Sequence, residues 1–402
     1  MRRVPVTAAA VFSLSLAAYL STVSAGLAEA ARGSQPNPCA APNEVGPSFE
    51  ETAWQIWVAA TCPVNSDQYP FVVWENWIEQ AQLYPANPSQ GLKVPNSGAP
   101  TATHILHNSP LTITLSPELA VTVPGLLGAP DAPCNKAKVP TPGQPNLIFC
   151  EEVRLNGAAE DYIAGTNLWN RTGQEQAAAN RDDIEFPRPA VEVKVDWTLL
   201  NSLGLDCNHL PDEFTTHPVH IETIHGNCFA MTGMHVMSKL IDKWIWATFE
   251  PQNSITNPNR CKDLGCYDPF GSKPAKCNGH DTQLSRKLEQ LMVAANLAPE
   301  WKNYRLDGVQ TDYFSPKLLQ NSVIEGENAG IPANRASCTT CHDLSSVKSD
   351  GIDGLTLLQA LPADPVGFPQ PLPSKAWIRR DFAWSLLLAC PNANPHFNAC
   401  AP

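Results

Sequence analysis

The stretch AVEVKVDW, residues 190–197, alternates strictly between apolar and charged side chains. Successive side chains of a β-strand point to opposite faces of a sheet, so one face carries a shared apolar set: Val191, Val193, Val195 and Trp197. The pattern predicts a half-buried strand whose apolar face lies on the core. Residues 244–249, WIWATF, place Trp244, Trp246 and Thr248 on one face and Ile245, Ala247 and Phe249 on the other, and predict a second strand.

The segments around these strands favour short helices. Residues Phe49–Ala60 (FEETAWQIWVAA) place Trp54, Trp57 and Val58 at helical spacing, and two glutamates near the start suit the positive end of the helix dipole. Apolar spacing predicts further helices at Phe71–Leu83, Glu160–Leu168, Asp281–Ala298, Leu318–Val323 and Asp381–Cys390. One more strand is expected at Leu111–Leu115.

Composition limits the fold class. The chain has 38 prolines in 402 residues, about twice the usual frequency of roughly 5%, so much of the backbone must run in turns and extended loops. No repeat and no clear linker divides the chain. We therefore predict one α+β domain, with short helices around a small sheet and long proline-rich irregular loops. The net charge of −12 argues against a nucleic-acid partner.

The first thirty residues have the pattern of an export signal. Arg2 and Arg3 precede an apolar run over residues 4–23, and two A-x-A-like cleavage sites follow at residues 23–25 and 28–30. The run is less apolar than the segment of roughly 20 residues that a membrane span needs. We expect residues 1–30 to be cleaved, which leaves a single domain over residues 31–402, without a stable membrane span, in the periplasm or outside the cell.

The motif that carries chemistry reads ASCTTCH, residues 336–342. Its C-x-x-C-H pattern is that of covalent haem attachment: the thiols of Cys338 and Cys341 each add to a haem vinyl group, and His342 ligates the iron. We predict one haem c, with residues 315–390 as the attachment region. A thioredoxin-like site would need a preceding strand–helix unit. A zinc site would need a second nearby pair of ligands.

The second axial ligand of the iron is open in the sequence, because no methionine follows Met292. Downstream, only His396 is available. Upstream, the candidates cluster at Met231, Met234, His235 and Met237. We favour His235 over Met234 and Met237, with a hydrogen-bonded core histidine as its alternative. A second metal at His217, His220 and His225 is not favoured, because no arrangement of carboxylates or cysteines around them in the sequence matches a known set of metal ligands.

The other eleven cysteines (13 minus 2) indicate an oxidising compartment. Sequential pairing predicts three disulfides: Cys134–Cys150, Cys207–Cys228 and Cys390–Cys400. Cys261, Cys266 and Cys277 form a local trio from which one thiol is left over.

Several of these motifs together resemble a family. They are WQIWVAA (54–60), VKVDW (193–197), GMH (233–235) with Lys239, WIWATFE (244–250), the motif at 338–342, and Asp381-Phe382. From about residue 50 to 390 the chain is similar to exported bacterial proteins described as cytochrome c family proteins. It departs at Cys62 and Pro251, where relatives tend to have Trp and His. The resemblance implies a haem and an exported location, and it brings no defined reaction.

Two functions follow as expectations. The first is a periplasmic monohaem c-type cytochrome that transfers electrons to or from a redox partner protein, as yet unknown. The second is a haem enzyme of the peroxidase or oxidase kind that acts on an unknown small substrate. The roughly 300 residues before the motif favour the enzyme, while the lack of a second haem motif counts against a dihaem peroxidase.

Overall fold

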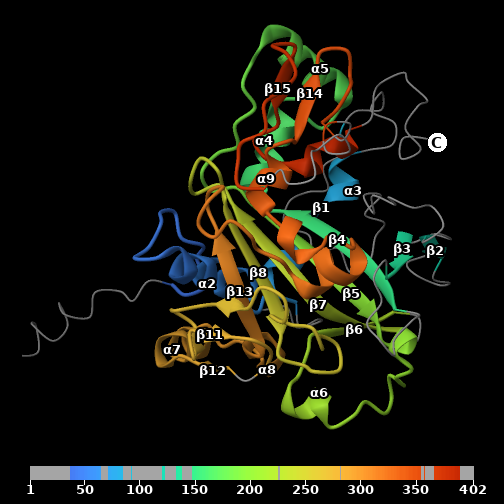
Figure 1. Cartoon of the computed structure of the whole chain (residues 1–402), viewed down its shortest axis with the longest axis vertical. Coiled ribbons are helices and arrows are strands. Elements are labelled where there is room, and N and C mark those ends of the chain that lie inside the picture. The colour runs from blue at the N-terminus through green and yellow to red at the C-terminus, as the bar shows by residue number, and fades with distance from the viewer. Residues whose placement is uncertain are drawn as a thin grey trace, which may run out of the picture.

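A computed structural model describes residues 37–64, 71–84, 92, 120–122, 133–137, 147–224, 227–280, 282–354, 357 and 366–389 (Figure 1). The predicted export signal, the strand at Leu111–Leu115, the Cys390–Cys400 pair, His225 and His396 lie outside these residues. No helix within the described ranges is long and apolar enough to cross a membrane.

An antiparallel sheet of nine strands forms the centre of the described structure. Its strand order is β13-β8-β7-β5-β4-β3-β2, with β1 paired to β4 and β6 paired to β7. Their bounds are β1 Ile78–Glu79, β2 Ala120–Thr122, β3 Pro133–Lys136, β4 Ile148–Leu155, β5 Val191–Leu199, β6 Ile221–Ile224, β7 Asn227–Ser238, β8 Ile245–Pro251 and β13 Tyr304–Gln310. The predicted α+β class, with short helices around a sheet, is confirmed.

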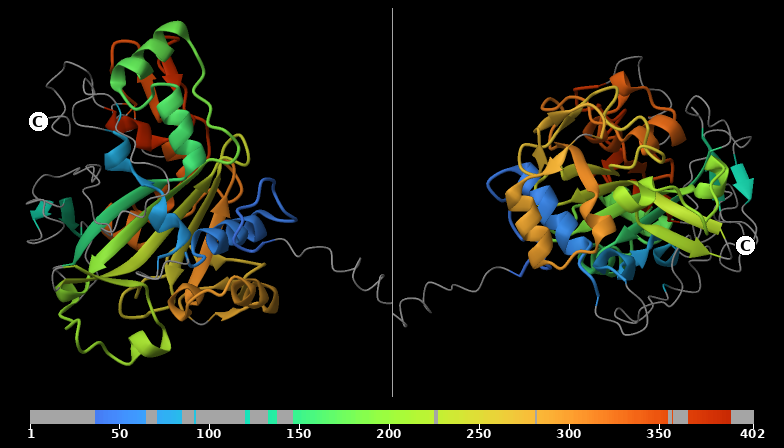
Figure 2. Two further views of the ribbon diagram at one scale, coloured as in Figure 1. Left: turned by 180° about the vertical axis from the view of Figure 1, so that it is seen from behind. Right: turned by 90° about the horizontal axis from the view of Figure 1, so that it is seen from below.

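Helix α2 (Phe49–Ala60) covers one face of this sheet, as its blue ribbon shows in Figure 2. The Ser48 hydroxyl accepts a hydrogen bond from the Glu51 N–H and caps the helix. The indole of Trp57 stacks on Phe249 of β8 with ring centroids 4.3 Å apart. The predicted apolar face of β5 packs into the same core, as its alternating pattern requires: Val191, Val193, Val195 and Trp197.

The opposite face of β5 is also buried, which differs from the half-buried strand that the sequence predicts. Asp196 is fully buried, and Glu192 is 7% exposed. The cover comes from the C-terminal third of the chain: η5 (Ser322–Asn328), α9 (Cys338–His342) and a segment over residues 377–388 that we call the covering strip. Figure 1 shows α9 between the sheet and the layer that holds α4, α5, β14 and β15.

The remaining elements are short. The helices are α3 (Gln80–Leu83), α4 (Gly157–Gly165), α5 (Arg171–Asn180), α6 (Glu213–Thr216), α7 (Arg286–Ala294), α8 (Pro299–Lys302), η1 (Val73–Asn76), η4 (Leu200–Leu203), η6 (Ala333–Arg335) and η7 (Trp384–Leu388). Small ladders pair β9 (Cys266–Tyr267) with β11 (Lys276–Cys277), β10 (Ser272–Lys273) with β12 (Gln283–Leu284), and β14 (Ser346–Lys348) with β15 (Trp377–Arg379).

Some of the helix predictions are confirmed and others are wrong. The expected bounds of Phe49–Ala60 are confirmed, and Asp281–Ala298 shortens to α7. A continuous helix over Phe71–Leu83 was wrong: Trp77 is extended, and β1 pairs with β4, so the segment splits into η1, β1 and α3. The predicted helix at Leu318–Val323 was wrong for residues 318–321, because the helical turns begin only at Ser322.

Four disulfides join the described residues. The predicted pairs Cys134–Cys150 and Cys207–Cys228 are confirmed. Cys261–Cys266 leaves Cys277 free, so the expected odd thiol of the trio is confirmed as well. The fourth bridge, Cys39–Cys62, ties the N-terminal segment to the end of α2 and was not predicted.

Candidate functional site

The three residues of the C-x-x-C-H motif lie together on the short helix α9. The Cys341 N–H donates to the Ser337 carbonyl at 3.0 Å, and the Thr339 N–H donates to the Gln310 side chain at 2.9 Å, so the turn is fixed to the end of β13. Both motif thiols are free of disulfide bonds. One helical turn therefore presents two thiols and an imidazole.

His342 is held in a defined tautomer. Its Nδ1 lies 2.8 Å from the carbonyl oxygen of Phe382 in the covering strip. A carbonyl can only accept, so Nδ1 carries the proton and Nε2 keeps a lone pair. Burial lowers the pKa of His342 to about 4, although the Phe382 carbonyl opposes this. The imidazole is thus neutral near pH 7, the form in which histidine binds metals.

The carbonyl that positions His342 comes from an unusual stretch of backbone. Asp381 and Phe382 have φ values of 50° and 66°, a left-handed conformation that non-glycine residues rarely adopt. Asp381 is fixed there by the Lys239 ammonium at 2.6 Å and by the Phe186 N–H at 2.7 Å. The Trp384 indole N–H also donates to the Cys341 carbonyl at 3.2 Å. The covering strip therefore fixes α9.

The two motif cysteines are thiols rather than thiolates in this environment. Burial, with the nearby Glu325 carboxylate adding to it, raises the pKa of Cys341 to about 11 and that of Cys338 well above its usual range. Trp246 of β8 packs against His342, and the centroids of the two rings lie 4.3 Å apart. Apolar packing and one carboxylate thus surround the motif.

His235 lies on β7 and shares the motif's side of the sheet. Its register partners are Lys194 and Thr248. Its Nε2 lies 2.8 Å from the Glu325 carboxylate, and the Asn321 N–H donates to the second oxygen of that carboxylate at 2.8 Å. Burial alone would raise the pKa of Glu325, but His235 and these hydrogen bonds bring it below its ordinary value. His235 is therefore a hydrogen-bonded histidine, which the sequence analysis gave as the alternative to an iron ligand.

The candidate methionine ligands divide between the two faces of β7. Met231 and Met234 are fully buried in the core under α2, so neither shares the motif's side of the sheet. Met237 shares the face of His235 and belongs to the apolar cluster that also includes Trp246 and the partly buried Cys338. The structure brings His235 and Met237, and not Met234, to the motif's side.

The charged positions of β5 complete this face, and we did not single them out in the sequence. The Lys194 ammonium lies 2.8 Å from Glu151, and the Asn328 amide donates to Asp196 at 2.9 Å. Burial and the nearby Glu151 raise the pKa of Asp196 well above its usual value. The alternation in AVEVKVDW does show that the strand has a second, charged face. It does not show whether that face is buried, so it could not mark these residues as part of a site.

A second group of titratable side chains surrounds His220. Its Nε2 lies 3.1 Å from Glu75 and 3.4 Å from Glu222, and the ligand atoms of all three lie within 4.8 Å of one another. Burial would lower the pKa of His220, but the hydrogen bond and the charge of Glu75 raise it. Burial raises the pKa of Glu222 to about 7. His220 thus has two carboxylate neighbours, Glu222 from the adjacent sequence and Glu75 from a distant element; His217 instead pairs with Glu213 at 3.3 Å.

Comparison of the chain with models of known families, with curated proteins and with solved structures gave no significant match. The case for a function therefore depends on the residues and contacts described above.

Proposed function

We propose that this protein is an exported c-type cytochrome that carries one covalently attached haem and transfers electrons. One observation carries the proposal: a single helical turn presents the free thiols of Cys338 and Cys341 beside a neutral His342 whose Nδ1–H is donated to a backbone carbonyl. The thiols would hold the haem through thioether bonds, and Nε2 of His342 would ligate the iron. The bound haem would supply one-electron redox chemistry.

The hydrogen bond to Phe382 supports the assignment of His342. Histidines that bind metals almost always donate their second ring N–H to a carbonyl or a carboxylate, which fixes the ring and makes the ligating nitrogen more basic. His235 has the same feature: its Nε2 faces the Glu325 carboxylate, so Nδ1 is left to act as a ligand. We therefore keep His235 as the first candidate for the second axial position, ahead of Met237.

The disulfides support an exported location. Such bonds persist in the periplasm or outside the cell, and they are rare in the reducing cytosol. Together with the signal pattern over residues 1–30, the bridges at Cys39–Cys62, Cys134–Cys150 and Cys207–Cys228 favour a protein that folds after export.

A haem enzyme is the second candidate, and one observation favours it. The partly buried His235–Glu325 pair lies on the motif's side of the sheet, where it can accept or donate a proton. The polarity and the donors of a haem pocket decide between electron transfer and oxygen or peroxide chemistry. Spectra of both redox states with cyanide, carbon monoxide and peroxide separate the two. Prompt ligand binding favours the enzyme, and indifference favours electron transfer.

Covalent attachment is tested by expressing the full chain in a host with haem-maturation machinery. The haem should stay on the protein through acid–acetone extraction and denaturing electrophoresis, and the reduced pyridine adduct should have a c-type spectrum. The double variant Cys338→Ala/Cys341→Ala should lose the covalent haem. Cys277→Ala, which removes a free cysteine outside the motif, should keep it. A b-type adduct in the wild-type protein, or retention in the double variant, would refute the proposal.

A further inference from the structure

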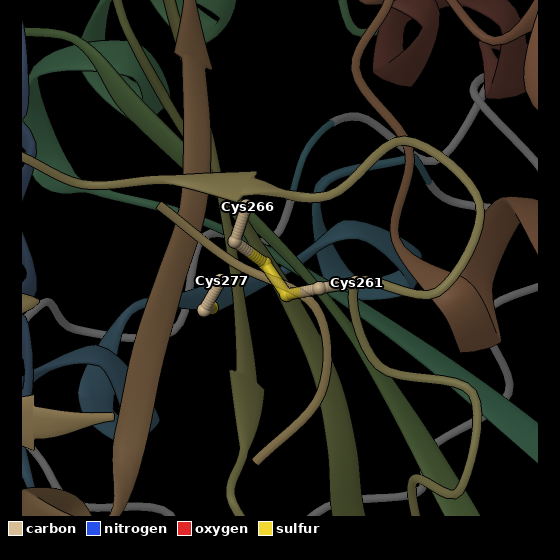
Figure 3. A group of neighbouring side chains, drawn as sticks. All are labelled: Cys261, Cys266 and Cys277. Atoms are coloured by element: carbon tan, nitrogen blue, oxygen red, sulfur yellow. A yellow bond between two sulfur atoms is a disulfide. The ribbon is translucent and has the colours of Figure 1, made fainter. Parts of the chain in front are cut away.

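The cysteine trio of the 251–280 region lies far in sequence from the haem motif. Figure 3 shows Cys261 and Cys266 joined by a disulfide, with the Cys277 side chain beside the bond. The three sulfur atoms lie within 4.8 Å of one another. Cys277 is partly exposed, while Cys261 and Cys266 are 8% and 5% exposed. A free thiol thus lies in contact range of an existing disulfide.

Strand pairing gives Cys266 a second possible partner. Strands β9 and β11 are antiparallel, and Cys277 is the direct register partner of Cys266. Directly opposed residues in such a ladder have Cα atoms about 4.5 or 5.5 Å apart. Both values fall inside the roughly 4.4–6.8 Å range of disulfides. Cys266 can therefore bond to Cys277 without a backbone rearrangement, just as it bonds to Cys261.

Two ionisable side chains, Arg260 and Asp307, complete the cluster. The Arg260 guanidinium, itself buried, lies 3.8 Å from the Cys277 sulfur. The attacking form of a cysteine is its thiolate, and the guanidinium can act as the counter-charge when a thiolate forms at Cys277. The Asp307 carboxyl oxygen lies 3.4 Å from the Cys261 sulfur and 3.1 Å from the Cys266 sulfur. Burial, aided by Glu250, raises the pKa of Asp307 despite the opposing effect of Arg260, so this group holds a proton readily.

We propose that Cys277 is the attacking thiol of an internal thiol–disulfide exchange site. The Cys277 thiolate attacks Cys266 Sγ, forms the Cys266–Cys277 bond and breaks the Cys261–Cys266 bond. Cys261 leaves as a thiolate and takes a proton from Asp307, and the proton that Cys277 lost to solvent returns to Asp307. One S–S bond replaces another, so the step needs no external oxidant or reductant.

The exchange would place a free thiol in a cavity. Cys261 lines a cavity of about 370 Å³ between residues 259–265 and residues 320–333, and Cys277 does not. The loops closed by the two alternative bonds differ by about twofold in length. The resulting difference in loop-closure entropy changes the equilibrium constant between the two bonds by only about threefold. Loop length alone therefore favours neither bond strongly, and both forms should be populated.

The test is disulfide mapping of the full-length oxidised protein. The protein is held at ~pH 8, where thiolates exchange, then blocked with N-ethylmaleimide and digested with pepsin in acid, where exchange stops. We expect peptides linked through Cys266–Cys277 as well as through Cys261–Cys266, and maleimide on both Cys261 and Cys277. Maleimide on Cys277 alone, with Cys261–Cys266 as the only linkage of the trio, would overturn the proposal.

Two matched variants sharpen the result. In Cys261→Ser the remaining pair should close as Cys266–Cys277 and leave no reactive thiol in the trio. In Cys277→Ser the disulfide should stay at Cys261–Cys266, and Cys261 should take no label. Unlinked Cys266 and Cys277 in a folded Cys261→Ser protein would also refute the exchange. The wild-type mapping needs no variant, so it stands even if a substitution prevents folding.

Discussion

The ion pair between Lys239 and Asp381 offers the most direct test of how the covering strip is held. Lys239 and Asp381 have side chains only 2% and 7% exposed, and the Nζ–Oδ1 distance is 2.6 Å. In Asp381→Ala the ammonium loses its nearer carboxylate but keeps the Asp242 carbonyl at 3.1 Å and Glu185 at 4.0 Å, and the Phe186 N–H loses its acceptor. Removing one partner of a buried pair costs about 3–5 kcal/mol.

Urea unfolding, followed by tryptophan fluorescence, measures this cost. With a slope of about 3 kcal/mol per molar, a loss of 3–5 kcal/mol lowers the midpoint by about 1–2 M. The matched control is Asp242→Ala, which breaks the ion pair between Asp242 and Arg188. The Arg188 side chain is 50% exposed and the Asp242 side chain is 82% exposed. An exposed pair contributes about 0–1 kcal/mol, so that midpoint should barely move. Equal shifts in the two variants would refute the argument.

Three further predictions follow from the same face of the sheet. Burial raises the pKa of Glu192 from 4.5 to about 7, so the fold loses stability as pH rises from 4.5 to 7, and the loss is complete above pH 7; Glu192→Gln should raise the unfolding free energy by about 1–3 kcal/mol at ~pH 8 and leave it nearly unchanged near ~pH 4.5, by urea titration at both values. The pKa of His342, lowered to about 4, predicts that the haem-free protein loses up to about 3 kcal/mol as pH falls from ~6.5 to 4; His342→Gln should abolish that slope, and a persistent slope would contradict the burial argument. His235→Ala should change the iron spin state in the optical spectrum while the haem stays attached, whereas an unchanged low-spin spectrum would move the ligand to Met237.

Local patterns made part of the fold predictable from the sequence. The period-two run of β5 and the helical spacing of Trp54 and Trp57 identify faces that do meet in the core. Strand β7 escaped prediction because nearly all its residues are buried on both faces, so no alternation marks it. Residues 71–83 match a helical spacing, but pairing with β4, which follows more than sixty residues later, overrides that preference.

The candidate site divides in the same way. Cys338, Cys341 and His342 are neighbours in sequence, so their motif is visible without a structure. The partners that tune the site are distant: Glu325 lies 90 positions from His235, and Phe382 lies 40 positions from His342. Glu75 lies 145 positions from His220. Spacing in one chain cannot reveal such contacts, because tertiary folding creates them.

Under the proposed haem attachment, the covering strip also has a consequence for the order of folding and modification. Phe382 accepts the His342 hydrogen bond, Ala383 accepts one from the Ser345 hydroxyl at 2.7 Å, and Phe382 packs into the apolar cluster on which Cys338 lies. Residues 377–388 emerge during synthesis after the motif does. Under the proposed haem attachment, the attaching enzyme would reach the two thiols most easily while the strip is undocked, and docking would then cover the turn that carries the haem. Changes that slow docking, such as Asp381→Ala, should lengthen this window of access, and changes that tighten the strip should shorten it.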